Sequence, residues 1–179
     1  MGRSVELAQI IAGCKSGDAD SFAQIVELYA GRCFGYFYRL TGDWDLSDEL
    51  LSELFIRLVK KIGSYKGGAF ESWLFRIALN IFHDHLRSRQ RRKRLLDGRR
   101  AELELRSDEP LKSDISDQRL DKLQGQLNRL DPDTRELIML RFYSELSFKE
   151  IAELRSEPIG TALSKLHRGL KKLRELMEG

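Results

Sequence analysis

Small polar and cationic side chains recur in the segment that follows Pro158. Apolar residues there recur at spacings of three and four, which predicts a helix over 158–177 that buries Ile159, Ala162, Leu166, Leu170 and Leu173. The opposite face then carries Thr161, Ser164, Lys165, His167, Arg168, Lys171 and Lys172. Such groups donate hydrogen bonds to base edges and pair with phosphates in a major groove, so we expect this helix to read duplex DNA.

The residues before Pro158 predict the helix that supports this one. Ser147 is suited to cap a helix over 147–155, and Glu150, three residues on, is its capping-box partner. Pro158 fits the first turn of the next helix, where its missing N–H is not needed. Two short helices joined by a tight turn form a helix-turn-helix. The alternative for this segment alone is a solvated amphipathic helix hairpin.

A second group of side chains is acidic. Residues 43–54 hold five acids and no base. If this segment is a helix, its spacing places five apolar residues on the inward face: Leu50, Leu51, Leu54, Phe55 and Leu58. The outer face of the same helix then carries Asp48, Glu49, Ser52 and Glu53. Carboxylates at i and i+4, as in Glu49 and Glu53, repel each other mildly, which favours a basic partner. A catalytic acid pair is the alternative, but no second catalytic group accompanies it.

A glycine-rich loop lies at the middle of the chain: Tyr65, Lys66, Gly67, Gly68 and Ala69. It precedes a predicted helix over 69–96, and residues 87–100 hold eight bases against one acid. A loop with an aromatic and a lysine ahead of a basic helix can take an unstacked base and its phosphates. The run His83-Asp84-His85 suggests metal ligands, but residues i and i+2 do not share a helix face, so we expect no metal site.

The 179-residue chain has a formal net charge of only +3, although 33% of its residues are charged. Charge is therefore segregated along the chain, which suggests two partners, one basic and one carrying phosphates. Cys14 and Cys33 lie in helical patterns without metal-ligand spacing, so we expect reduced core residues. No apolar run is long enough to cross a membrane and no secretion signal is seen, so we expect a cytoplasmic protein without membrane insertion.

Helical periodicity covers nearly the whole chain, and there is no sustained alternation of β-branched residues. We therefore predict an all-α fold with helices at 4–15, 18–41, 45–62, 69–96, 115–129, 132–144, 147–155 and 158–177. Asp131 and Pro132 predict the start of the sixth helix. Residues 97–114 are polar and lack an apolar face, which predicts a flexible linker between a domain at 1–96 and a smaller one at 115–179.

Four motifs in this order resemble the extracytoplasmic-function (ECF) group of bacterial sigma factors, in the sigma-70 family that directs RNA polymerase to promoters. Gly17-Asp18 with Ser21-Phe22 resembles the opening of the group's first domain. Residues 47–55 resemble its Ala-Glu-Asp-Leu-Val-Gln-Glu-Val-Phe signature. Residues 70–87 resemble its Phe-x-x-Trp-Leu-Tyr-Arg-Ile-Ala-x-Asn-x-x-x-Asp-x-x-Arg signature. Residues 130–173 resemble the second domain, with its Leu-Ser-Tyr-x-Glu-Ile-Ala-Glu and Pro-x-Gly-Thr-Val-x-Ser-Arg-Leu sequences.

The resemblance implies a role for each group of residues. The clamp coiled coil of core RNA polymerase would bind Asp48, Glu49, Ser52 and Glu53, and the polymerase flap is a further expected contact. The melted −10 element would be held by Tyr65, Lys66, Gly67, Gly68, Ala69, Arg76, Asn80 and Arg87. The −35 duplex would be read by Pro158, Gly160, Thr161, Ser164, Lys165, His167, Arg168 and Lys171. An anti-sigma factor is a further expected partner. The resemblance implies no catalytic residue, no enzymatic activity and no cofactor.

Several positions depart from the family pattern. Glu49 and Ser52 stand where Asp and Gln are usual, so the clamp contact keeps its charge and loses an amide. Arg155 and Ser156 stand where Leu-Gly is common, so we expect the turn to lack its glycine and the preceding helix to lose an apolar contact. Leu163 replaces an outward Lys or Arg, so we expect weaker or altered −35 recognition.

Two other classes of protein stay open on the sequence. A free-standing helix-turn-helix regulator explains the last third of the chain but leaves the acidic helix and the 70–87 motif unexplained. Autonomous binding to duplex DNA would identify it. A helical enzyme such as a nuclease needs clustered carboxylates or histidines, which the sequence does not offer. For a sigma factor, we expect two domains that move relative to each other until polymerase or an inhibitor fixes them.

Overall fold

The computed structural model describes residues 2–97, 118–144 and 146–178. In these residues the fold is all-α, without a strand, as predicted. The helices are α1 (Gly2–Ser16), α2 (Ala19–Thr41), α3 (Trp44–Lys61), a 3-10 turn η1 (Ile62–Ser64), α4 (Phe70–Asp97), α5 (Gln118–Asn128), α6 (Pro132–Phe142), α7 (Phe148–Arg155) and α8 (Ile159–Glu178). Each predicted helix is present, with small differences at its ends. The predicted linker at 97–114 lies outside the described residues, apart from Asp97, which ends α4.

Local capping groups explain where several helices begin. The Asp131 side chain accepts a hydrogen bond from the backbone N–H of Thr134 at the start of α6, with Pro132 in the first helical position. Ser147 and Glu150 form the predicted reciprocal capping box at the start of α7. These side chains satisfy N–H groups that have no partner within the helix, so the short helices of the C-terminal half start at defined residues.

Helices α1 to α4 form the N-terminal domain around an aromatic and aliphatic core. Tyr36, Phe37, Phe75 and Leu74 are fully buried in it. The inward residues predicted for α3 are buried or half-buried, as expected. Cys14 and Cys33 are free and buried, which confirms their role in the core. Burial raises the pKa of the Cys33 thiol to about 12, so this thiol stays protonated.

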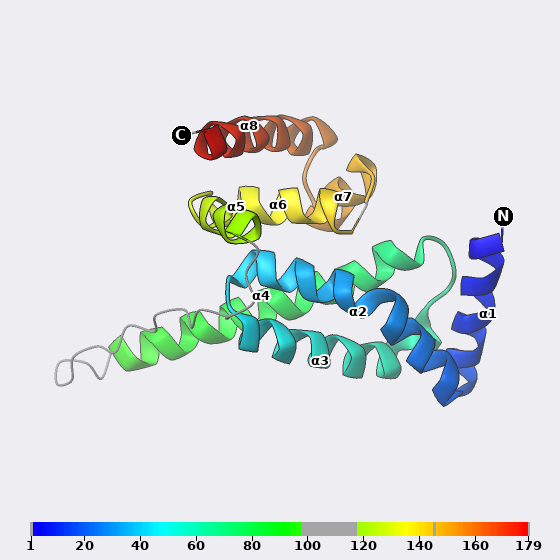
Figure 1. Ribbon diagram of the computed structural model, residues 1–179. Helices are drawn as coiled ribbons and strands as arrows, with labels where there is room; N and C mark the ends of the chain where they lie inside the picture. The colour runs from blue at the N-terminus through cyan, green and yellow to red at the C-terminus, as the bar shows by residue number, and fades with distance from the viewer. Residues whose placement is uncertain (1, 98–117, 145, 179) are drawn as a thin grey trace.

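Helices α5 to α8 form the C-terminal domain, in which α6 lies between α8 and α2 (Figure 1). Ala162 and Leu166 face inward on α8, as predicted. The prediction for Ile159 is wrong, because this side chain is 45% exposed. Ile159 is the first residue of α8 and precedes Ala162, the first residue at which the helix is buried. The apolar core of this domain is continuous with that of the N-terminal domain.

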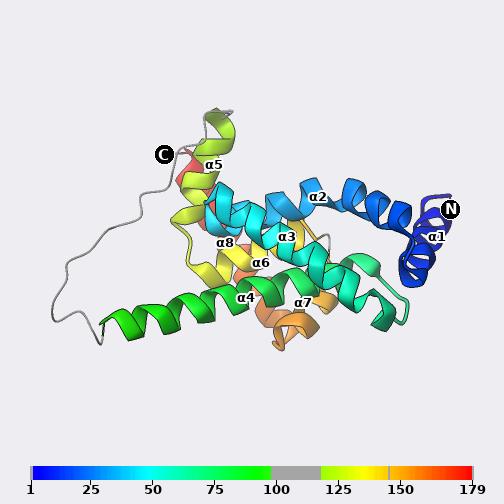
Figure 2. The same cartoon turned by 90° about the horizontal axis from the view of Figure 1, so that it is seen from below.

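Helix α4 is long, and its C-terminal half projects beyond the bundle (Figure 2). This half carries most of the basic run noted in the sequence, in residues 87–94, all of them exposed. Among the described residues, no helix is long and apolar enough to cross a bilayer.

Candidate nucleic-acid interface

The turn between α7 and α8 is made without glycine. Ser156 has φ 53° and ψ 42°, in the left-handed region that glycine usually occupies. The N–H of Glu157 donates to the carbonyl of Ala152 at 3.0 Å, which closes the end of α7. This confirms the expectation that the turn lacks its glycine, and a serine now bears the unfavourable backbone conformation.

Arg155 supports this turn from inside the domain. Its side chain is only 8% exposed and forms ion pairs with Asp133 and Glu136 of α6 and, at 2.8 Å, with Glu157. Burial disfavours the charged guanidinium, but the carboxylates outweigh burial and raise the pKa of Arg155. The residue that the sequence suggested as a lost apolar contact is therefore the centre of a buried ion cluster.

The predicted DNA-reading face of α8 is open to solvent over most of its length. Its exposed residues are Gly160, Ser164, His167, Arg168 and Lys171, together with Pro158 just before the helix, while Thr161 is half-buried. Leu163 is 44% exposed on the same helix, so the apolar side chain does lie outward. Helix α8 lies on the far side of α6 from the N-terminal domain (Figure 1), which leaves this face uncovered by it.

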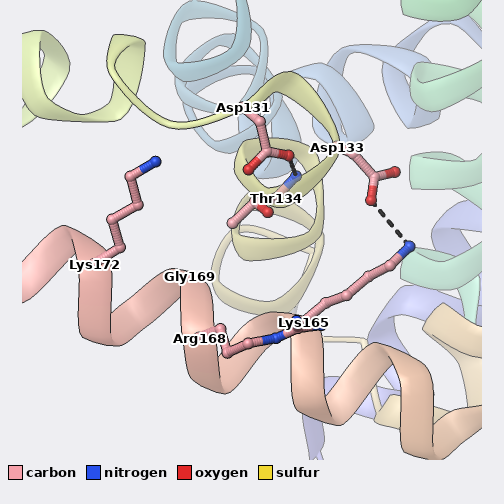
Figure 3. A pocket seen from close by; sticks show the side chains of 7 residues that line it. All are labelled: Asp131, Asp133, Thr134, Lys165, Arg168, Gly169 and Lys172. Atoms are coloured by element: carbon pink, nitrogen blue, oxygen red, sulfur yellow. Dashed lines mark hydrogen bonds and ion pairs between the residues drawn. The ribbon is translucent and has the colours of Figure 1, made fainter.

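Lys165 differs from the other cationic residues of this face. Its Nζ lies 3.0 Å from Asp133 and 2.8 Å from Glu157, and Figure 3 shows its side chain extended toward Asp133. Hydrogen bonds to Glu157 and Asp133 raise the pKa of this amine. A DNA contact by Lys165 therefore requires exchange of these carboxylates for phosphate or base atoms.

A small groove of about 310 Å³ lies between the start of α6 and α8 (Figure 3). Gly169 lets the two helices approach there, because a Cβ at this position would lie 2.4 Å from Cγ2 of Thr134. The contact fixes α8 against α6, with Arg168 and Lys172 at the edge of the groove. The close packing at this groove thus positions the cationic face of α8. The residues that line the groove do not form a catalytic group.

The glycine-rich loop has two residues with positive φ, Gly67 at 98° and Gly68 at 97°. Lys66 to Ala69 are exposed, whereas Tyr65 is only 8% exposed. The Tyr65 hydroxyl donates to the carbonyl of Gly68 at 2.6 Å, and its ring packs edge-on against Phe70 at 5.6 Å. The loop therefore presents Lys66 and backbone groups to solvent, while the tyrosine ring supports it from below.

Lys15 of α1 is a second support for the loop that sequence reasoning missed. Its Nζ donates to the carbonyl of Tyr65 at 2.6 Å and lies 5.4 Å from the centroid of the Tyr65 ring. Both residues line a groove of about 1000 Å³ between α1, α2 and the loop. No local pattern signals this contact, because the two residues lie 50 positions apart in the sequence.

The residues of α4 that were predicted to hold the −10 element lie on one exposed side of that helix. Arg76, Asn80 and Arg87 are spaced by four and seven residues and are exposed. Arg87 also pairs with Asp84 at 2.6 Å, and Asp84 binds Arg57 of α3 at 3.0 Å. Hydrogen bonds from Arg87 and then Arg57 lower the pKa of Asp84. Asp84 therefore bridges Arg57 of α3 and Arg87 of α4.

Within the described ranges, no group of three His, Cys, Asp or Glu residues could hold a metal ion. His83, the first residue of the suspected run, has its Nε2 2.6 Å from Oε2 of Glu136 on α6. Its partner is thus a carboxylate of the other domain.

The acidic side of α3 faces solvent as predicted. Asp48, Glu49 and Ser52 are exposed, and Glu53 is half-buried and bound to Arg57 at 2.6 Å. Two apolar residues continue the exposed side of this helix, Ile56 at 50% and Val59 at 52% exposure. Sequence reasoning missed them, because the charge pattern that marks this face ends at Glu53. The surface is therefore acidic at the start of α3 and apolar toward its end.

The fold and these surfaces define a two-domain helical protein with an exposed acidic face on α3, an exposed glycine loop and a helix-turn-helix. Residues 25–92 match Sigma-70 region 2, and residues 120–173 match Sigma-70, region 4. The chain is 31% identical to the ECF RNA polymerase sigma factor SigW of Bacillus subtilis, covering 90% of this chain and 91% of that protein. It is 35% identical to the RNA polymerase sigma factor CarQ of Myxococcus xanthus, covering 91% and 92%.

The chain therefore belongs to the sigma-70 family of RNA polymerase sigma factors, in its ECF group. The function of this family is promoter-directed initiation of transcription. The matches therefore support a sigma factor over a free-standing helix-turn-helix regulator. Among solved structures, the sigma factor RpoE of Bartonella quintana in complex with the anti-sigma factor NepR is 25% identical, with a TM-score of 0.73 over 89% of this chain and 98% of that one. CnrH, in complex with the cytosolic domain of CnrY, shares the fold at a TM-score of 0.68 and 20% identity.

Proposed function

We propose that this protein binds core RNA polymerase through the exposed side of α3 and reads a promoter at two points, the −10 element with the 65–69 loop and the −35 element with α8. The observation that carries the proposal is the combination, in one chain, of a solvent-facing acidic helix within the region 2 match and a solvent-facing cationic helix within the region 4 match. Residues 1–96 and 115–179 are the proposed domains, joined by 97–114.

Core polymerase would bind Asp48, Glu49, Ser52 and Glu53. The proposal is supported by the exposure of the first three side chains, which carry no intramolecular ion pair among the described contacts. Glu53 would need to share its carboxylate between Arg57 and the clamp. Carboxylates opposite a basic coiled coil give orientation and fast association, and the apolar Ile56 and Val59 beside them would add buried area.

The −10 element would be held as melted single strand at the 65–69 loop. Lys66, Gly67, Gly68 and Ala69 are accessible to a base and its phosphates, and Tyr65 would act as the support of the loop. Asn80 would join the loop in capturing bases, and Arg76 and Arg87 would hold backbone phosphates along α4. Exposed glycines allow close approach of the strand, and the cations add a salt-dependent attraction.

The −35 element would be read in the major groove by α8. Ser164, His167 and Arg168 are the accessible base-contacting candidates, and a good bidentate contact is worth about 1–3 kcal/mol of discrimination. The remaining proposed contacts are Pro158, Gly160, Thr161 and Lys171, and Lys165 once it leaves Asp133 and Glu157.

We place the protein in the cytoplasm, with the polymerase flap as a further contact of the C-terminal domain and an anti-sigma factor as an inhibitory partner. The likeness to RpoE of Bartonella quintana, which was solved with NepR, supports the last of these. Bond formation during initiation belongs to the polymerase, so this chain is a non-enzymatic factor that needs no cofactor or metal of its own.

Run-off transcription with purified core polymerase and a library of promoter fragments tests the proposal. Transcripts that depend on this protein are expected, with start sites that define its −10 and −35 sequences. Glu49→Lys should weaken binding to core polymerase about tenfold or more, whereas Glu27→Lys, the same change on the exposed side of α2, should not. Tight duplex binding by the protein alone, without affinity for core polymerase, would contradict it.

A further inference from the structure

Asp133 and Glu157 each join two cations of the C-terminal domain. One carboxylate oxygen of Asp133 accepts from Arg155, and the other accepts from Nζ of Lys165 at 3.0 Å. Glu157 divides its oxygens in the same way, with Oε1 2.8 Å from Nε of Arg155 and Oε2 2.8 Å from Nζ of Lys165. The ammonium of Lys165 is therefore held at two points, by one carboxylate from α6 and one from the turn before α8 (Figure 3).

Arg155 orients these two carboxylates from inside the domain. Each of its three guanidinium nitrogens binds a different acid, Nε to Glu157, Nη1 to Glu136 and Nη2 to Asp133. Burial disfavours the ionised carboxyls of Asp133 and Glu157. Hydrogen bonds from Lys165 and then Arg155 outweigh burial, so the pKa values of both carboxyls are lowered. Both acids therefore stay ionised at neutral pH and are already in position when DNA arrives.

Lys165 is needed for the charge balance of this ion cluster. Three carboxylates face two cations while the ammonium is in place, and they face one cation after it leaves. The side chains of Arg155, Glu136 and Glu157 are at most 12% exposed, so water replaces the lost charge poorly. The ammonium would also give up two charge-assisted hydrogen bonds. Departure of Lys165 from the cluster is therefore costly unless its new partner replaces what it loses.

Other cations of α8 are not restrained in this way. Arg168 and Lys172 lie at the edge of the same groove (Figure 3) and are exposed. Neither forms an ion pair with a residue of the described ranges, whereas Lys165 forms two. An exposed cation without a carboxylate partner pairs with any phosphate near it, so these two side chains attract DNA of every sequence.

The two carboxylates make the response of Lys165 depend on what the DNA offers. A single phosphate of unrelated DNA replaces only one of the two hydrogen bonds that the ammonium has in the ion cluster. A base edge with two acceptors, such as N7 and O6 of guanine, replaces both, but only where the sequence places it beside α8. The exchange is therefore favoured at a matching sequence and disfavoured elsewhere.

We propose that Asp133 and Glu157 restrain Lys165 so that it contacts DNA only where the −35 element offers base-edge acceptors, and that this restraint raises the selectivity of α8. The role at the −35 element rests on the proposed function, whereas the restraint of the lysine does not. Selectivity is a difference between two affinities, and the carboxylates act on it by lowering the affinity for unrelated DNA. Asp133 and Glu157 are thus positioning residues that determine specificity through Lys165.

The double variant Asp133→Asn with Glu157→Gln tests the inference in the full-length protein. Its matched control is Glu153→Gln with Glu178→Gln, two exposed acids of the same domain that form no ion pair within the described ranges. Fluorescence anisotropy measures the affinity for a duplex of unrelated sequence over a range of salt concentrations. The test variant should bind this duplex about threefold more tightly than the control. Its slope of log affinity against log salt should be steeper by about 0.9, as for one added phosphate contact.

Lys165→Met separates the restraint from a general effect of charge. In the otherwise unchanged protein it should leave the salt slope for unrelated DNA as it was, because the restrained lysine makes no phosphate contact. Added to the double variant, it should reduce the gain in affinity to that of the control. Asp133→Asn alone, at a side chain that is 55% exposed, should act in the same direction as the double variant and keeps the buried part of the ion cluster intact.

Holoenzyme with core polymerase then tests selectivity on the promoter found by run-off transcription. The ratio of affinities for this promoter and for a copy with a scrambled −35 element should fall about threefold in the double variant and not in the control. An equal gain on unrelated DNA for the control, the same gain without Lys165, or an unchanged ratio would each overturn the inference. Absence of promoter-dependent transcription by every holoenzyme, with affinities for unrelated DNA as expected, would contradict only the proposed function.

Discussion

Glu136 of α6 pairs with Arg155 of α7 inside the C-terminal domain, directly behind the turn of the helix-turn-helix. Both side chains are almost fully buried, at 10% and 8% exposure. Asp133 and Glu157 complete the charge balance around the guanidinium. Leucine is common at this position in the family, and here Arg155 and its ion cluster take its place, so the turn is held by charge where the family pattern has an apolar contact.

Arg155→Met should destabilise the C-terminal domain by about 3 kcal/mol, because it removes the guanidinium beside the buried Glu136 and leaves Glu157 with Lys165 alone. Denaturant unfolding followed by circular dichroism measures the change. Arg174→Met, at an exposed position of α8, is the matched control and should change the stability little. Equal stability of the two variants would show that the buried cluster contributes nothing.

Lys15→Met should weaken capture of the melted −10 strand, because the 65–69 loop loses the charged hydrogen bond to Tyr65. We expect at least about a threefold loss in permanganate reactivity of melted thymines, with binding to core polymerase unchanged. Lys60→Met, at an exposed position of α3, is the control. Recovery by Lys15→Arg would support a positioning role, and full activity of Lys15→Met would contradict it.

Leu163→Arg should tighten promoter binding by the holoenzyme, since Leu163 is 44% exposed beside the cationic side chains of α8. One added phosphate contact should steepen the slope of log affinity against log salt by about 0.9. Leu163→Gln, which is polar and uncharged, should leave the slope unchanged. The same slope for both variants would mean that position 163 does not reach the DNA backbone.

Acid should weaken the start of α7 through Glu150. Hydrogen bonds from Ser147 and then Ser72 lower the pKa of this carboxyl below 4.5. A lowered folded-state pKa gives stability that is present above about pH 4.5 and is lost as the pH falls through the folded value. Glu150→Gln should therefore be less stable than the wild type near neutral pH, and its stability should fall less as the pH is lowered from about 5 to about 3. Thermal unfolding across this range measures both, and parallel curves would contradict the assignment.

The parts of this fold that sequence reasoning predicted depend on local patterns. The starts of α6 and α7 follow from Asp131, Pro132, Ser147 and Glu150, whose capping roles involve neighbours three residues away. The exposed rows of α3 and α8 follow from helical periodicity alone. Ile159 shows the limit of that pattern, because periodicity assigns a residue to a face of the helix but does not tell which residues of that face become buried.

The parts that were not predicted depend on contacts between distant segments. Arginine is usually a surface residue, and the burial of Arg155 is explained only by the fold, in which α6 places Asp133 and Glu136 beside it. Lys15 is an ordinary helical lysine until the fold places Tyr65 beside it. Gly35 has no local reason to be glycine, and the reason is a tyrosine far along the chain, at position 143.

The projecting end of α4 has a consequence for the speed of promoter search. The second half of α4 projects beyond the bundle (Figure 2), and the basic residues Arg89, Arg91, Arg92, Lys93 and Arg94 are exposed there. A cluster of positive charge at the projecting end of a helix attracts DNA at long range and orients the protein before contact. The second half of this helix should therefore govern the association rate, with a strong dependence on ionic strength, while the lifetime of the complex is set by groups nearer the loop.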